Sequence, residues 1–174
     1  MDIVRLIGLG VFLVIMGSAG SAAADSPSLT GTYLLDEEAS DDMVESFEPA
    51  IEEMGRVRRG FARRAIERED GPDHQVLINH SDDEISIQFG DEPVQRIPLN
   101  GQTVENKNSD GDTIEQSARV DGSQTVMVQT QSDKGVTATE YRLDTDTDKL
   151  EVAMELDFDQ LPKKVDYRIV YDRQ

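Results

Sequence analysis

The sequence predicts a mainly β protein: an antiparallel up-and-down meander of about ten strands that closes into a barrel, with a helical segment inserted after the first strand. Two observations support this prediction. From His74 to the C-terminus, apolar and polar residues alternate with the period of two that half-buried strands show. Between Glu37 and Asp70, apolar residues instead recur at spacings of three and four, which is the period of an amphipathic helix. Short strands at even spacing are typical of a closed barrel or a sandwich.

The first strand is expected at Leu29–Asp36, where β-prone residues follow a glycine and acidic residues end the run. The helical segment is expected to form two helices, Ser40–Phe47 and Glu48 to about Arg68. The boundary is placed just before Pro49, between Phe47 and Glu48, because proline is tolerated in the first turn of a helix and not in its interior. The apolar stripe of these helices consists of Met43, Phe47, Ala50, Ile51, Met54, Val57, Phe61 and Ala65.

The later strands are separated by short turn-forming sequences. These are Ser81-Asp82-Asp83, Gly90-Asp91, Asn100-Gly101, Ser109-Asp110-Gly111, Asp121-Gly122 and Asp133-Lys134-Gly135. One stretch, Lys149–Leu161, also has residues that are acceptable in a helix, and its alternation alone favours a strand. The final strand is expected to place Val165, Tyr167, Ile169 and Tyr171 on one face.

The N-terminal segment has the three parts of an export signal. A short basic start, Met1–Arg5, precedes the apolar run Leu6–Met16 and the small-residue stretch Gly17–Ala24. A membrane anchor is the alternative, but it needs about 20 apolar residues, and this run is shorter. Because the sequence contains no cysteine, it offers neither a lipoprotein anchor nor disulfide bonds. We therefore expect a signal peptide at residues 1–24, a single domain at 25–174, and a periplasmic or secreted product without stable membrane insertion.

The mature protein is expected to begin at Asp25, because Ala22 and Ala24 are small at the positions that define cleavage. N-terminal sequencing of protein from the periplasmic fraction measures this directly. Full-length protein recovered from the inner membrane would contradict it.

The chain is strongly acidic, with 36 acidic against 17 basic residues and a net charge of -19. Nucleic acids and anionic membrane surfaces are disfavoured as partners, since both require a basic face. Three explanations for the acidity remain: solvation in a salty habitat, attraction of a basic partner, and binding of multivalent cations. The acidic residues are spread along the whole chain, which favours the salty habitat.

The two ends of the mature chain resemble a known family. The chain opens with Gly31-Thr32-Tyr33 and closes with Val170-Tyr171-Asp172-Arg173. These motifs and the order of the elements resemble the calycin group with its lipocalin-like organisation, and most closely its fatty-acid-binding-protein branch, which opens with Gly-Thr-Trp. The chain is also similar to export-signalled bacterial proteins of unassigned role. The resemblance implies a calycin-like barrel with a helical lid at residues 40–70.

The resembled branch anchors a fatty acid through an arginine and a tyrosine two residues apart on its last strand. When the family's tyrosine is placed on Tyr171, the arginine position falls on Ile169, while Arg168 points to the opposite face. The resemblance therefore implies an apolar or uncharged ligand in place of a free fatty acid. The candidate lining residues are Tyr33, Phe61, Met154, Tyr167, Ile169 and Tyr171.

Catalytic and metal-binding patterns are weak in this sequence, and we expect no enzyme, cofactor or metal. The two histidines, His74 and His80, are six residues apart in or beside one predicted strand, an even spacing that allows them to share a face, but no third ligand accompanies them. They are therefore interpreted as surface or turn histidines.

Two stretches partly match a calcium-binding loop. Asp144-x-Asp146-x-Asp148 has Lys149 where the loop needs glycine, and Asn106-x-Asn108-x-Asp110-Gly111 has Ser117 where it needs a bidentate glutamate. Both are interpreted as acidic hairpin turns.

Six arginines cluster in the second predicted helix: Arg56, Arg58, Arg59, Arg63, Arg64 and Arg68. Two interpretations remain open. The arginines form a polar helix face paired with neighbouring acidic residues, or, as the resemblance implies, they give a lid a basic face toward a membrane or an anionic ligand head.

Taken together, these observations favour an exported binding protein that holds a small apolar ligand inside a barrel. The alternative is a protein-binding module that acts through its surface, as an inhibitor or an envelope accessory factor. Its partner would then be another protein.

Overall fold

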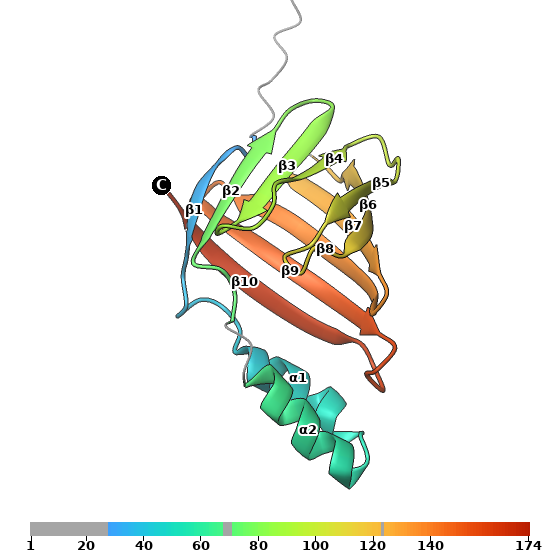
Figure 1. Ribbon diagram of the computed structural model, residues 1–174. Helices are drawn as coiled ribbons and strands as arrows, with labels where there is room; N and C mark the ends of the chain where they lie inside the picture. The colour runs from blue at the N-terminus through green and yellow to red at the C-terminus, as the bar shows by residue number, and fades with distance from the viewer. Residues whose placement is uncertain (1–27, 68–70, 123) are drawn as a thin grey trace, which may run out of the picture.

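The computed structural model describes residues 28–67, 71–122 and 124–174, and its strands form one antiparallel sheet that curls into a nearly closed barrel (Figure 1). The strands are β1 (Gly31–Leu35), β2 (Gln75–His80), β3 (Glu84–Phe89), β4 (Gln95–Pro98), β5 (Val104–Lys107), β6 (Thr113–Val120), β7 (Thr125–Ser132), β8 (Gly135–Asp144), β9 (Lys149–Phe158) and β10 (Val165–Arg173). The helices are α1 (Met43–Glu52) and α2 (Arg56–Ile66). The predicted signal peptide lies outside the described residues.

The topology is the predicted meander of ten strands. Strands that are neighbours in sequence pair with each other, except β4 and β5, and β1 also pairs with β10, so the order is β4-β3-β2-β1-β10-β9-β8-β7-β6-β5. The ambiguous stretch forms strand β9, which pairs along its length with both β8 and β10. The alternating pattern of Lys149–Leu161 therefore predicts its structure better than its helix propensity does, because β8 and β10 provide hydrogen-bond partners for the backbone of β9 on both sides. At the tight β7–β8 turn, Gly135 is required: a Cβ atom would come within 2.2 Å of the carbonyl oxygen of Asp157.

The predicted helix boundary at Pro49 is wrong. Helix α1 continues through Pro49 to Glu52, and the break occurs at Gly55, whose extended backbone precedes α2. The physical reason lies just after the proline, where Ala50 and Ile51 are fully buried. Their burial offsets the hydrogen bond that proline removes from the helix. Asp42 caps α1 by accepting a 2.9 Å hydrogen bond from the backbone N–H of Glu45.

The helices lie at one end of the barrel, which we call the mouth (Figure 1). The far end is filled by an apolar core: Leu143, Leu150 and Tyr171 occupy paired positions on three neighbouring strands and are at most 2% exposed. Toward the mouth, inward-facing Thr137 and Leu156 form another such pair but stay partly exposed. Solvent therefore reaches the inner wall from the mouth.

Strands β4 and β5 are the two edges of the sheet, and side chains join the barrel across this seam. The buried Gln116 side chain of β6 donates from Nε2 to Oε1 of Gln95 on β4 at 2.7 Å and to Thr130 on β7 at 3.1 Å. Its Oε1 accepts from Asn106 on β5 at 2.9 Å. These bonds replace part of the missing backbone ladder, which explains why a polar residue is tolerated in the interior.

Candidate ligand-binding site

Three of the six predicted site residues lie together on the inner face of β10. Tyr167, Ile169 and Tyr171 are all buried, while Arg168 between them is exposed. Arg168 donates outward to the carbonyl oxygen of Ala39 at 3.2 Å. Strand β10 therefore has the predicted alternation, and Ile169 occupies the inner wall beside its paired neighbour Val152.

The Tyr171 hydroxyl is the most unusual polar group of the interior. It is fully buried and has no hydrogen-bond partner among the described residues. Burial raises the pKa of Tyr171. Burial, and to a smaller extent the nearby Tyr171, raises the pKa of Tyr141. Both groups therefore stay neutral phenols at ordinary pH, and Tyr171 keeps one unused O–H donor.

Ile169, where the resembled family has its arginine, is apolar. The nearest arginine on the same face of β10 is Arg173, and its side chain is already bound to other groups. Arg173 lies at the far end, where Nη2 donates to the carbonyl oxygen of Thr30 at 2.5 Å and the guanidinium group stacks on the Tyr33 ring. Tyr33 itself is fully buried, and its hydroxyl donates to the carbonyl oxygen of Leu29 at 2.7 Å. Tyr33 therefore belongs to the packed far end, and its hydroxyl is not free for a ligand.

The two remaining predicted residues differ in position. Met154 pairs with Tyr167 across β9 and β10 and stays partly exposed, so it lines the inner wall on the mouth side. Phe61 lies apart from the other five: it is on α2, 66% exposed, and faces a hollow outside the barrel.

That hollow, which we call the helix groove, separates the helices from the β7–β8 and β9–β10 turns and has a volume of about 470 Å³. Its walls are Phe47, Met54, Phe61, Ala65, Phe158 and Leu161. Arg58 and Lys134 line it as well. Sequence reasoning missed Lys134, Phe158 and Leu161; the only local signal is that Phe158 continues the alternation of β9 by one more apolar residue and that Leu161 follows it.

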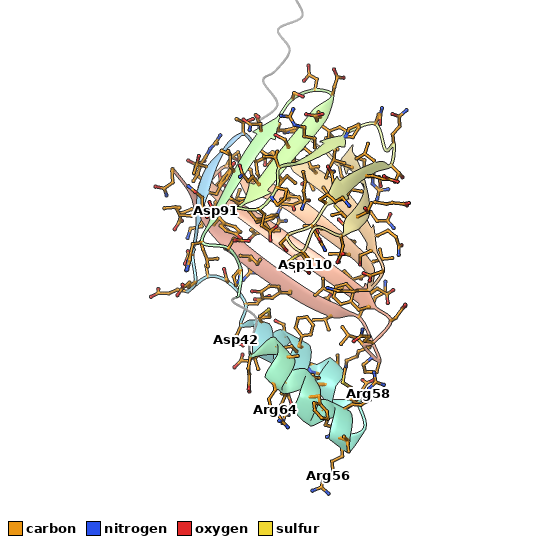
Figure 2. All side chains as sticks on the ribbon, in the orientation of Figure 1. Asp42, Arg56, Arg58, Arg64, Asp91 and Asp110 are labelled. Atoms are coloured by element: carbon orange, nitrogen blue, oxygen red, sulfur yellow. The ribbon has the colours of Figure 1, made fainter. Side chains whose placement is uncertain are left out.

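The five described arginines of the cluster are only partly paired with acidic side chains, and Arg68 lies outside the described residues. Arg63 forms an ion pair with Glu48, and the hydrogen bond from Arg63 lowers the pKa of that carboxyl group. Arg58 instead donates to the carbonyl oxygen of Gln160 at 3.2 Å. Figure 2 shows Arg58 on the side of the β9–β10 turn, whereas Arg56 and Arg64 point away from the barrel. The paired-face interpretation therefore holds for Arg63 and leaves Arg58 unexplained.

The predicted acidic turns are confirmed as hairpin connections. Between β8 and β9, the Asp144 carboxylate accepts from the backbone N–H of Asp146 at 2.9 Å. Between β5 and β6, the Asn108 side chain accepts from the N–H of Asp112 at 2.8 Å. Within the described ranges, no cluster of three acidic or histidine side chains is placed to hold a metal ion.

His80 is the more buried of the two histidines. Its Nδ1 accepts a long, 3.4 Å hydrogen bond from the Leu29 N–H, and burial lowers its pKa. Among the described residues, no helix is both long and apolar enough to cross a membrane.

No protein-family model matches the sequence, and no curated protein matches it. Two of the solved structures with a similar fold illustrate the likeness. A "REP1-NXSQ fatty acid transporter" is 17% identical with a TM-score of 0.50, over 84% of this chain and 96% of that one. A fatty-acid-binding protein from brain tissue of Drosophila melanogaster is also 17% identical, with a TM-score of 0.48, over 80% of this chain and 94% of that one. At this identity the likeness concerns the fold, which is a calycin-like β-barrel, as the resemblance at both chain ends predicts.

Proposed function

We propose that the protein is an exported binding protein, periplasmic or secreted, that holds one small, uncharged apolar ligand inside the barrel. The observation that supports this best is the buried, partnerless hydroxyl of Tyr171. A buried donor without a partner costs about 1–3 kcal/mol. A ligand with one acceptor oxygen, such as an alcohol, ketone or ester, would satisfy this donor and remove that cost. The partly exposed inner wall at Thr137, Met154 and Leu156 supports entry from the mouth.

The inner face of β10 favours an uncharged head group over a carboxylate. A carboxylate that leaves water for an apolar interior needs a cation and hydrogen bonds to offset its desolvation. Ile169 stands at the anchor position, and Arg173 is held at the far end by Thr30. One solved protein of similar fold is named a fatty acid transporter, which supports a ligand with an apolar chain. The apolar inner face of β10, in contrast, disfavours a carboxylate head group on that ligand.

Dodecanol is expected to bind inside the barrel more tightly than laurate, which has the same chain length. The sequence contains four tyrosines and no tryptophan, so tyrosine fluorescence reports directly on the interior. The Tyr171→Phe change should weaken dodecanol binding about five- to tenfold, the worth of one hydrogen bond. It should leave the unliganded protein equally stable or more stable, because no native bond is lost.

Tyr33→Phe is the matched control, because that hydroxyl has a partner in Leu29. It should lower the free energy of unfolding by about 1 kcal/mol and leave dodecanol binding unchanged. If dodecanol does not change the tyrosine signal of the native chain, the interior-ligand proposal fails and the surface-binding alternative gains.

A further inference from the structure

Helix α2 is exposed on nearly all sides. Its 11 residues include no buried side chain, and Val57 and Phe61 are 74% and 66% exposed. An isolated helix shorter than about 12–15 residues is marginal in water. The apolar side of α2 therefore gains from an occupant of the groove beside it.

The helix groove has the walls of a small-molecule site. Its apolar surface comes from both helices and from the β9–β10 turn, at Phe47, Phe61 and Leu161 among others. Its volume of about 470 Å³ lies within the range of roughly 300–1,000 Å³ that ligand pockets occupy. The groove lies at the mouth-side end of the barrel, and its lining residues include none of the interior residues Tyr167, Ile169 and Tyr171.

The groove is also distinctive in the charge of its lining. Arg58 and Lys134 line it, and none of the described residues that line it is acidic. Another hollow, beside the start of β2 and the β3–β4 turn, is instead lined by Asp73, Asp91 and Glu92. In a chain of net charge -19, a basic apolar groove is unusual.

Both cations have capacity for an anion. Arg58 uses one donor on the Gln160 carbonyl oxygen, and a guanidinium group has five. Lys134 lies 3.9 Å from Asp110, and its side chain is 57% exposed, so this contact contributes little.

We propose that the helix groove binds a single-chain anionic amphiphile. The apolar chain lies along Phe61 and the aromatic and aliphatic walls, and the anionic head is held by Arg58 and Lys134. The protein then has two sites with opposite head-group preferences, an uncharged one in the barrel and an anionic one in the groove. The groove site does not depend on whether the interior binds a ligand.

A Phe61→Trp variant tests the proposal, because it introduces the sole tryptophan of the chain at the groove. Laurate and dodecyl phosphate, each as monomers in solution, should shift its emission to shorter wavelength in a saturable way. Dodecanol should need at least tenfold higher concentration. Comparison of the carboxylate and the phosphate shows which anionic head the groove prefers.

Adding Arg58→Glu and Lys134→Glu to this variant should weaken laurate binding at least tenfold and leave dodecanol unchanged. Arg56→Glu, on the same helix but outside the groove (Figure 2), is the matched control and should change laurate binding less than twofold. Calorimetry measures laurate binding without the added tryptophan. The native chain should bind laurate, and Phe61→Ala should lose most of this binding.

Three outcomes would overturn the proposal. Equal losses from Arg56→Glu and Arg58→Glu would show that the net charge of the helix attracts the anion without a specific site. A response to phosphatidylglycerol vesicles and not to monomeric laurate would make α2 a membrane-binding helix. Laurate binding that Tyr171→Phe weakens and the groove variants leave intact would place the anion in the barrel. Failure of dodecanol to reach the interior would disprove only the proposed function and leave this test unaffected.

Discussion

The Ile169→Arg variant is expected to bind laurate in the barrel interior more tightly than dodecanol, the reverse of the native preference. The new cation would lie on the inner face of β10, two residues from the Tyr171 hydroxyl, and both could contact one carboxylate. Close buried charge pairs are worth about 2–5 kcal/mol, so the ratio of the two affinities should change about 30-fold or more. Tyrosine fluorescence measures both affinities at the interior site.

The same variant should be unstable without its ligand. An uncompensated buried charge costs about 3–5 kcal/mol, so urea unfolding of the free variant should shift by that amount, and saturating laurate should recover most of it. Ile169→Met is the control, since it preserves volume without charge and should cost less than about 1.5 kcal/mol. If the native chain already prefers laurate by the tyrosine signal, another cation reaches the interior and the uncharged-ligand proposal fails.

The barrel could be predicted because its pattern is repeated. Several alternating runs and the turns between them indicate the same topology independently, so the ambiguous run at Lys149–Leu161 was decided by its own period. The helix break could not be placed in the same way. Proline normally disfavours a helix interior, but the burial of Ala50 and Ile51 depends on contacts that only the folded chain provides.

The candidate site was predictable where one strand determines it. Tyr167, Ile169 and Tyr171 share a face because a strand repeats every two residues. The state of the Tyr171 hydroxyl was not predictable, since Tyr33, an equally buried tyrosine, finds a partner in Leu29. Which hydroxyl is satisfied depends on backbone atoms brought close by the fold.

The helix groove was beyond sequence reasoning for a related reason. Phe61 belongs to an apolar stripe on α2. Such a stripe indicates that this face of the helix packs against something, but it does not indicate which segment of the chain packs there. The groove is completed by Phe158 and Leu161, about a hundred residues later in the chain. Phe61 was therefore grouped with the barrel lining, while the structure places it beside the β9–β10 turn.

Two alanine substitutions on one strand should separate the packed far end from the open mouth. Leu150 and Met154 both face inward on β9, but Leu150 is fully buried in the far-end core and Met154 is partly exposed near the mouth. Leu150→Ala should lower the free energy of unfolding by about 3–5 kcal/mol, because it removes packing and leaves a cavity. Met154→Ala should cost less than half as much, since its side chain is already in contact with solvent.

Ligand binding should show the opposite order. Met154→Ala should weaken dodecanol binding several-fold, because the side chain lines the inner wall beside Tyr167, and Leu150→Ala should leave dodecanol binding nearly unchanged. Urea unfolding and tyrosine fluorescence on the two variants measure both quantities. Equal losses of stability would mean that the mouth side is as tightly packed as the far end. The barrel would then have no room for a ligand, and binding by this protein would have to occur on its outer surface.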